Sequence, residues 1–202
     1  MPEDIAGLGE SLRQAFKADR TATTVVLARR ILKLNPRDAA TWARLGSALT
    51  NLANFDEAEV ALRNALVHCE ASKRILVYTQ LGHLFHHRGD YATATEWFER
   101  VIELDPTDAA GHIYLGGSLA MQGKLEEAEA SHRNAAECTS GCIDEAYHNI
   151  GLLLRAQGRL EESAVCFRRA LDIDPEYSDS QLALDDVTHA MCYSTRSGRP
   201  EA

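Results

Sequence analysis

A leucine or isoleucine followed by glycine recurs four times along this chain of 202 residues, at a nearly constant spacing. The four glycines, Gly46, Gly82, Gly116 and Gly151, lie 36, 34 and 35 residues apart. Self-similarity at one fixed period is typical of repeat architectures, in which each unit buries its apolar face against its neighbours. The period therefore predicts several copies of one small supersecondary unit, stacked in sequence order.

Other positions keep a fixed distance from each glycine. An aromatic residue or histidine stands three residues before the Leu or Ile of each pair. A small residue follows twelve residues after the glycine, and a larger residue sixteen after it. Ala or Val stands nineteen residues after the glycine. In chain order these are Trp42, Tyr78, His112 and Tyr147; Ala58, Ala94, Ala128 and Ser163; Leu62, Phe98, His132 and Phe167; and Ala65, Val101, Ala135 and Ala170. The repeat thus extends over a whole unit.

Each unit has the pattern of two helices. Tyr78, Leu81 and Phe85 lie at positions i, i+3 and i+7, which share one face of a helix. A second stretch with the same periodicity follows after a short break. Gly82 and Ala94 are small, as expected where two helices cross closely. The pattern predicts antiparallel helix pairs.

Turn and capping residues stand at the breaks in this periodicity. Proline follows the second helix in several units and prevents its continuation. Asp38 and Asp108 precede the next helix, where an aspartate can cap the first backbone N–H groups. The predicted turns within units are Gly89-Asp90, Gln122-Gly123 and Gln157-Gly158.

At these positions the chain resembles the tetratricopeptide repeat family. The resemblance implies an all-α, right-handed superhelical solenoid of antiparallel helix pairs. We expect about five units, at 5–38, 39–74, 75–108, 109–143 and 144–177, in a single domain over 1–193. The first unit is degenerate, because Leu12 and Thr24 stand where glycine and alanine are expected. Its helices are predicted near 4–17 and 21–34.

One more amphipathic helix is predicted over 178–192. Leu184, Val187 and Met191 share the face that would cover the last repeat, and the other face is polar. Stacked arrays need a terminal element of this kind, because an uncapped end would expose the core. Residues 194–202 are predicted to form a disordered tail.

Composition excludes several classes of function. The formal net charge of −9 argues against nucleic acid or an anionic membrane as the main partner, since both require clustered Lys and Arg. The five cysteines are scattered and odd in number, which does not resemble a disulfide framework. The sequence shows no membrane-spanning run and no signal peptide at its start. A cytoplasmic location is predicted.

The resemblance implies that the first helices line a concave groove, where a protein or peptide partner would bind. The candidate residues are those on first helices that point away from the Leu/Gly packing face. They are Arg13, Lys17, Arg44, Ser47, Asn51, Thr79, His83, His86, His87, Ile113, Gly117, Met121, His148, Asn149, Leu152 and Arg155. This surface is more basic than the molecule as a whole, so we expect a ligand with an apolar anchor and some negative charge. The weak first unit or an exposed edge could also allow self-association.

Three histidines in LGHLFHHRGD, His83, His86 and His87, permit two interpretations. They could form a polar groove wall whose charge changes near pH 6.5. Alternatively, His83 and His87 lie four residues apart and could hold a metal ion, which would make the chain a metal-responsive or metal-carrying accessory protein. The facing positions of the next unit, such as Ile113 and Gly117, offer no third ligand, so the groove interpretation is preferred.

No catalytic or cofactor motif stands out. Cys138 and Cys142 lack the CxxC spacing, and Gly7-Leu8-Gly9 lacks a third glycine and a preceding strand. No nucleophile, base and oxyanion donor are suggested together. The sequence therefore predicts a non-enzymatic interaction scaffold without a cofactor.

Overall fold

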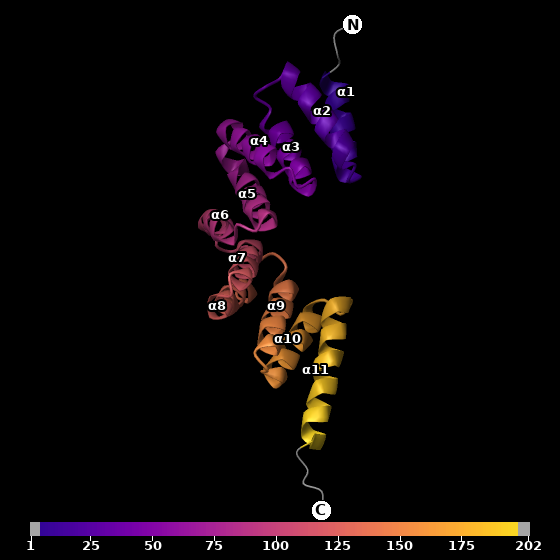
Figure 1. Ribbon diagram of the computed structural model, residues 1–202, viewed down its shortest axis with the longest axis vertical. Coiled ribbons are helices and arrows are strands. Elements are labelled where there is room, and N and C mark those ends of the chain that lie inside the picture. The colour runs from indigo at the N-terminus through magenta and orange to yellow at the C-terminus, as the bar shows by residue number, and fades with distance from the viewer. Residues whose placement is uncertain (1–4, 198–202) are drawn as a thin grey trace, which may run out of the picture. The chain divides into compact units, whose positions relative to one another are not determined.

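The computed structural model describes residues 5–197, and within this range it is all helical. The chain divides into two compact units, Met1–Val101 and Ile102–Ala202. The first holds α1 (Ile5–Lys17), α2 (Thr21–Leu34), α3 (Ala39–Asn51), α4 (Phe55–His68), the short 3-10 helix η1 (Ala71–Lys73), α5 (Arg74–Arg88) and most of α6 (Tyr91–Leu104). The second holds α7 (Ala109–Met121), α8 (Leu125–Ala136), α9 (Ile143–Ala156), α10 (Leu160–Ile173) and α11 (Ser178–Ser197). Figure 1 shows this succession of helices.

The helix pairs form as the repeat predicts, including the degenerate first pair. Helices α1 and α2 agree with the predicted 4–17 and 21–34 to within one residue. Leu12, at the position of the missing glycine, is buried, as is Thr24. The prediction of antiparallel helix pairs is therefore confirmed.

The repeated glycines allow the two helices of a pair to touch. A Cβ atom on Gly82 would lie 2.3 Å from Cε1 of Phe98, far inside van der Waals contact. Gly151 meets Phe167 in the same way, at 2.6 Å. The glycine and the large residue sixteen positions later form one contact, and this contact explains their common spacing.

The predicted turns and caps are also confirmed. Gly89 ends α5 in the left-handed region, with φ 86°, where a side chain is disfavoured. The Asp38 carboxylate accepts hydrogen bonds from the backbone N–H groups of Ala40 and Thr41, at 3.1 and 3.2 Å. Asp108 accepts one from Ala110 at 2.8 Å. These bonds satisfy N–H groups that the first turn of a helix leaves unpaired.

Helix α11 covers the last repeat but is longer than predicted. Val187 is fully buried against Phe167 and Ala164, and Leu184 and Met191 pack at the edge of the same cluster. The helix runs to Ser197 rather than ending at 192, so the predicted disordered tail is wrong for 194–197. The rest of that tail, 198–202, lies outside the described residues.

Candidate binding surface

The first helices of the N-terminal unit enclose a pocket of about 250 Å³. Helix α1 contributes Arg13, Phe16 and Lys17. Helix α3 contributes Ala43 and Arg44, which lie on its side away from the Leu45-Gly46 contact with α4. The remaining lining residues are Ala40, Leu76 and Gln80. Three cations thus border a pocket whose apolar part is formed by Phe16, Leu76 and alanine methyl groups.

A second pocket of about 270 Å³ shares one wall with the first. Its lining residues are Ser47, Thr50, Asn51, Gln80, His83 and His87. Gln80 lines both pockets, so together they form one surface across α1, α3 and α5, here called the N-terminal groove. The side-chain oxygen of Gln80 is buried and has no hydrogen-bond partner. A buried carbonyl oxygen without a donor is costly.

The cations of the groove differ in how they are paired. The guanidinium of Arg13 donates a hydrogen bond to the Glu10 carboxylate at 3.0 Å. This bond is the main cause of the lowered pKa of Glu10, and the positive charge of Lys17 adds a smaller effect. Arg44 is half-buried and has no ion pair or hydrogen bond within the described residues. Arg44 therefore supplies positive charge that a ligand could neutralise.

The three histidines do not act as one wall. His83 and His87 line the second pocket, whereas His86 packs edge-on against Tyr91, with ring centroids 5.1 Å apart. Burial, with smaller effects of His87 and His86, lowers the pKa of His83 from 6.5 to about 4. Burial also lowers the pKa of His86. The expected change of charge near pH 6.5 is therefore wrong for His83, which stays neutral there.

The predicted groove residues of the N-terminal unit mostly come together. Thr79 lines neither pocket, because its hydroxyl turns back to the carbonyl of Ile75 at 2.9 Å. His86 also lies outside both pockets. Those that line one or the other are Arg13, Lys17, Arg44, Ser47, Asn51, His83 and His87.

In the C-terminal unit, helix α11 occupies the surface predicted to be open. His148 is buried, with Nδ1 2.8 Å from the Ser180 hydroxyl and its ring 5.0 Å from that of Tyr177. Arg155 pairs with Asp186 of α11 at 3.2 Å, and Leu152 packs on the cluster that includes Val187. The placement of His148 in an open groove is therefore wrong, whereas Arg155 keeps a side chain that is 39% exposed.

The apolar floor predicted from α7 is also largely covered. Ile113 is only 4% exposed and packs with Ala109, Ala135 and Ala146. Gly117 differs, because a Cβ atom there would meet nothing within 4 Å. Met121 is 56% exposed, and Asn149 is half-buried. Of the predicted residues on α7 and α9, Gly117, Met121 and Asn149 thus keep part of this surface open.

The described residues offer little support for a metal centre. Among residues 5–193 no group of three or more His, Cys, Asp and Glu side chains is placed to hold a metal ion. Cys138 donates to the backbone carbonyl of Asn134 at 3.3 Å, and burial raises the pKa values of Cys138 and Cys142. Raised thiol pKa values disfavour the thiolate needed for metal binding or nucleophilic attack.

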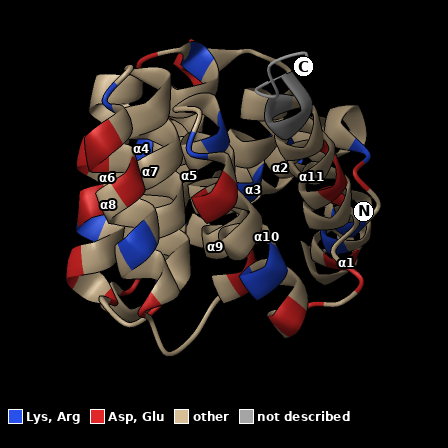
Figure 2. Ribbon diagram, turned by 90° about the horizontal axis from the view of Figure 1, so that it is seen from below, with Lys and Arg blue, Asp and Glu red and all other residues tan. Residues whose placement is uncertain are grey.

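Two residues that line the groove, Ala40 and Leu76, were missed as site candidates from the sequence. Leu76 precedes His83 by seven residues, so helical spacing alone places it on the same stripe of α5. That spacing was the available signal for Leu76. In contrast to the cations of the groove, which lie on first helices, acidic residues are exposed on second helices. Examples are Glu96, Glu99, Glu126 and Glu127. Figure 2 shows acidic positions along α6 and α8.

The architecture and surface described above define a repeat protein built from helix pairs. The sequence profiles of the tetratricopeptide repeat match residues 39–66, 75–108 and 144–177. The chain belongs to the tetratricopeptide repeat family. In the described residues, no helix is long and apolar enough to cross a bilayer.

Curated relatives are much longer than this chain. Cellulose synthase operon protein C of Xanthomonas axonopodis pv. citri (strain 306) is 31% identical over 183 residues, which is 88% of this chain and 12% of that protein. The general transcriptional corepressor trfA of Dictyostelium discoideum is 25% identical over 154 residues, covering 73% of this chain and 11% of its own length. The chain thus spans about an eighth of the length of these relatives.

Solved structures share the fold at low sequence identity. A thermophilic tetratricopeptide repeat protein of Thermus thermophilus has a TM-score of 0.68 and 19% identity, over 92% of this chain and 99% of that one. MamA from Desulfovibrio magneticus RS-1 has a TM-score of 0.71 and 14% identity, over 88% of this chain and 98% of that one. YrrB, described as having an unusual peptide-binding site, has a TM-score of 0.62 and 19% identity, over 89% of this chain and 91% of that one.

Proposed function

We propose that this chain is a non-enzymatic scaffold that binds a peptide segment of a partner protein in the N-terminal groove. The tetratricopeptide repeat fold is generally a protein–protein interaction scaffold, which supports the class of function. Among the described residues, the groove joins two pockets along the first helices α1, α3 and α5. The proposal requires no cofactor, and we propose a cytoplasmic location alongside it.

The observation that carries this proposal is the position of Gln80 between the two pockets. A ligand that contacts Gln80 can reach Arg44 in one pocket and His83 in the other. An extended peptide has this elongated form. YrrB, which shares this fold and is described as having an unusual peptide-binding site, supports this use of the fold.

The charges and apolar groups of the groove favour one kind of peptide. Arg44 and Lys17 attract a carboxylate, and the exposed apolar side chains of Phe16 and Leu76, 38% and 56% exposed, offer a place for an aliphatic or aromatic anchor. The partner segment is therefore acidic with at least one apolar residue. The metal-carrying alternative is not carried forward, since among residues 5–193 no group of three or more His, Cys, Asp and Glu side chains is placed to hold a metal ion.

The experiment selects peptides from a displayed random library on the purified chain and measures their affinity by fluorescence anisotropy. We expect enrichment of acidic and apolar residues. Arg44→Glu should weaken binding at least about tenfold, equivalent to about 1.4 kcal/mol. Arg168→Glu is the matched control, because it changes the net charge equally from an exposed position on α10. Equal affinity for both variants would contradict binding in the groove.

A further inference from the structure

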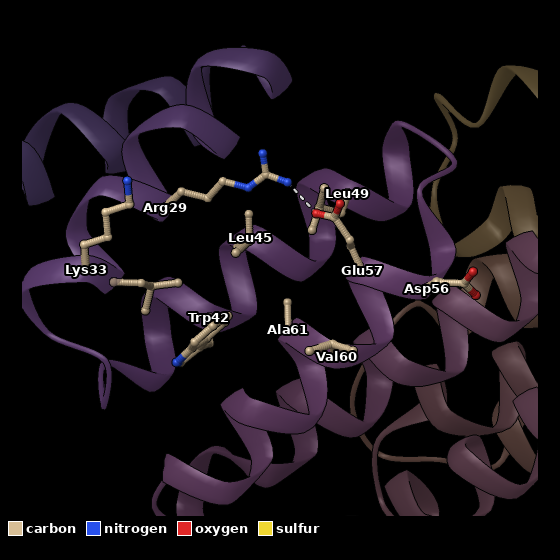
Figure 3. Close-up of a pocket in the computed structure, with 10 residues that line it drawn as sticks. Arg29, Lys33, Trp42, Leu45, Leu49, Asp56, Glu57, Val60 and Ala61 are labelled. Carbon is tan, nitrogen blue, oxygen red and sulfur yellow. Dashed lines mark hydrogen bonds and ion pairs between the residues drawn. The ribbon is translucent and has the colours of Figure 1, made fainter.

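An open apolar pocket lies on the other side of α3, facing the second helices. Its volume is about 570 Å³, and Leu32, Trp42, Leu45, Leu49, Val60 and Ala61 form its apolar surface. Figure 3 shows Trp42, Leu45 and Ala61 around the open space between α2 and α4. None of these residues lines the N-terminal groove, so this Trp42 pocket is a separate feature.

The repeat places a small side chain at the border of this pocket. Ala61 stands fifteen residues after Gly46, and the equivalent residue of the next repeat, fifteen after Gly82, is Trp97. Trp97 is 7% exposed and packs against Tyr78, the equivalent of Trp42, with ring centroids 5.5 Å apart. The methyl group of Ala61, 1% exposed, thus borders the pocket at the position where the next repeat has an indole ring.

The walls of the Trp42 pocket are held in position. The indole N–H of Trp42 donates to the carbonyl of Pro36 at 2.8 Å, which fixes its ring. Arg29 of α2 and Glu57 of α4 form an ion pair that joins the two walls (Figure 3). Apolar pockets of about 300–1,000 Å³ with a few fixed polar groups are typical of binding sites. Val60, 59% exposed, extends the apolar surface outward.

The charges at the rim select the ligand. The two acidic residues are already paired, Glu57 with Arg29 and Asp56 with Arg88, the latter at 3.5 Å. Lys33 has no ion pair or hydrogen bond to any described residue. The unneutralised charge beside the apolar pocket is therefore positive. In the filled repeat a cation also accompanies the indole, since Arg100 lies 4.5 Å from the centre of the Trp97 ring.

We propose that the Trp42 pocket is a second docking site, which takes an aromatic side chain from a partner protein segment with an adjacent carboxylate. The aromatic ring would occupy the space that Trp97 fills in the next repeat, and the carboxylate would meet Lys33. This site would let the scaffold hold two partner segments at once, one on each side of α3.

The test uses the two tryptophans of the chain, Trp42 and Trp97, whose indole ¹H–¹⁵N signals report the open and the filled place separately. The probe is the blocked peptide acetyl-Glu-Ala-Trp-Glu-Ala-amide, with the unlabelled peptide added to the ¹⁵N-labelled chain. We expect a saturable shift of the Trp42 signal at peptide concentrations up to about 1 mM, and none of the Trp97 signal. Two control peptides should not produce this shift of the Trp42 signal. One has Ala in place of Trp, and the other has Lys in place of each of the two Glu residues.

Ala61→Trp copies the filled repeat and should abolish the shift while the protein remains folded. Lys33→Glu leaves the pocket intact and should weaken binding about fivefold. Arg44→Glu should not change it, which separates this site from the N-terminal groove. Absence of a saturable shift, or the same shift in Ala61→Trp, would overturn the proposal. A Trp42 signal that moves with protein concentration alone would overturn it in favour of a second copy of the chain.

Discussion

The imidazole of His132 packs directly on Gly116: a Cβ atom on that glycine would lie 2.6 Å from Cε1 of the ring. The other repeats place Leu62, Phe98 and Phe167 against their glycines. His132 is 3% exposed, and its Nδ1 atom is buried without a hydrogen-bond partner. A polar ring therefore occupies an apolar position that the rest of the chain fills with hydrocarbon.

His132→Phe should raise the free energy of unfolding by about 1–3 kcal/mol, because it removes a buried nitrogen that lacks a partner and keeps a ring of similar shape. Urea unfolding at neutral pH, followed by circular dichroism, measures this change. The reciprocal change Phe167→His is the control and should destabilise the protein. A less stable His132→Phe variant would show that the Nδ1 atom has a partner in solution.

Acid should destabilise the fold through the same residue. Burial lowers the pKa of His132 from 6.5 to about 4, so the folded state keeps it neutral while the unfolded chain takes up a proton. Stability is therefore lost as the pH falls from 6.5 towards 4, by up to the order of 3 kcal/mol, and the loss is complete below the folded-state pKa. His83, with a pKa of about 4, adds a similar loss.

Urea midpoints measured across this pH range test the account of acid destabilisation. The slope of stability against pH should be smaller in His132→Phe and smaller still when His83→Phe is added. Parallel pH profiles for the wild type and His132→Phe would contradict a depressed pKa at this position.

Ala53 lies in the left-handed region, with φ 56°, at the turn where later repeats have Gly89, Gly123 and Gly158. This conformation costs a residue with a Cβ atom about 1 kcal/mol. Ala53→Gly should therefore raise the unfolding free energy by roughly that amount, less the added entropy of the unfolded chain. Gly89→Ala is the opposite control and should lower the unfolding free energy. The added Cβ would meet nothing within 4 Å, so backbone strain would be the cause of that loss. If both variants lose stability, entropy of the unfolded chain outweighs strain at residue 53.

The buried hydrogen bond between His148 and Ser180 anchors α11 to α9. Ser180→Ala would leave Nδ1 of His148 buried without a partner, which costs about 1–3 kcal/mol. We expect faster amide hydrogen exchange along α11 in this variant. Thr188→Ala, at an exposed position of the same helix, is the control and should exchange like the wild type. Unchanged protection of α11 in Ser180→Ala would mean that apolar packing around Val187 is sufficient.

The helix pairs could be predicted from the sequence because the cause of each repeated position is local. Gly82 and Phe98 touch within one pair, and Asp38 caps the helix that follows it directly. The positions of α1 and α2 followed from the same periodicity, even though Leu12 replaces the glycine.

The open surface was harder to predict because it depends on contacts between successive helix pairs. Such contacts leave no pattern in the local sequence. The sequence placed a helix over the last repeat and also left His148 open, yet the covering helix lies on it. Ile113 is covered because a neighbouring first helix supplies Ala146. The Trp42 pocket is bordered by the small side chain of Ala61, whose size becomes informative only by comparison with Trp97.

The most direct measurement of the central claim is a chemical-shift map of a library-selected peptide on the ¹⁵N-labelled chain. Binding in the N-terminal groove predicts the largest changes at Arg44, Gln80 and His83, with the α10 and α11 amides unaffected. Largest changes on the second helices, or on the C-terminal unit, would contradict the assignment of peptide binding to this groove.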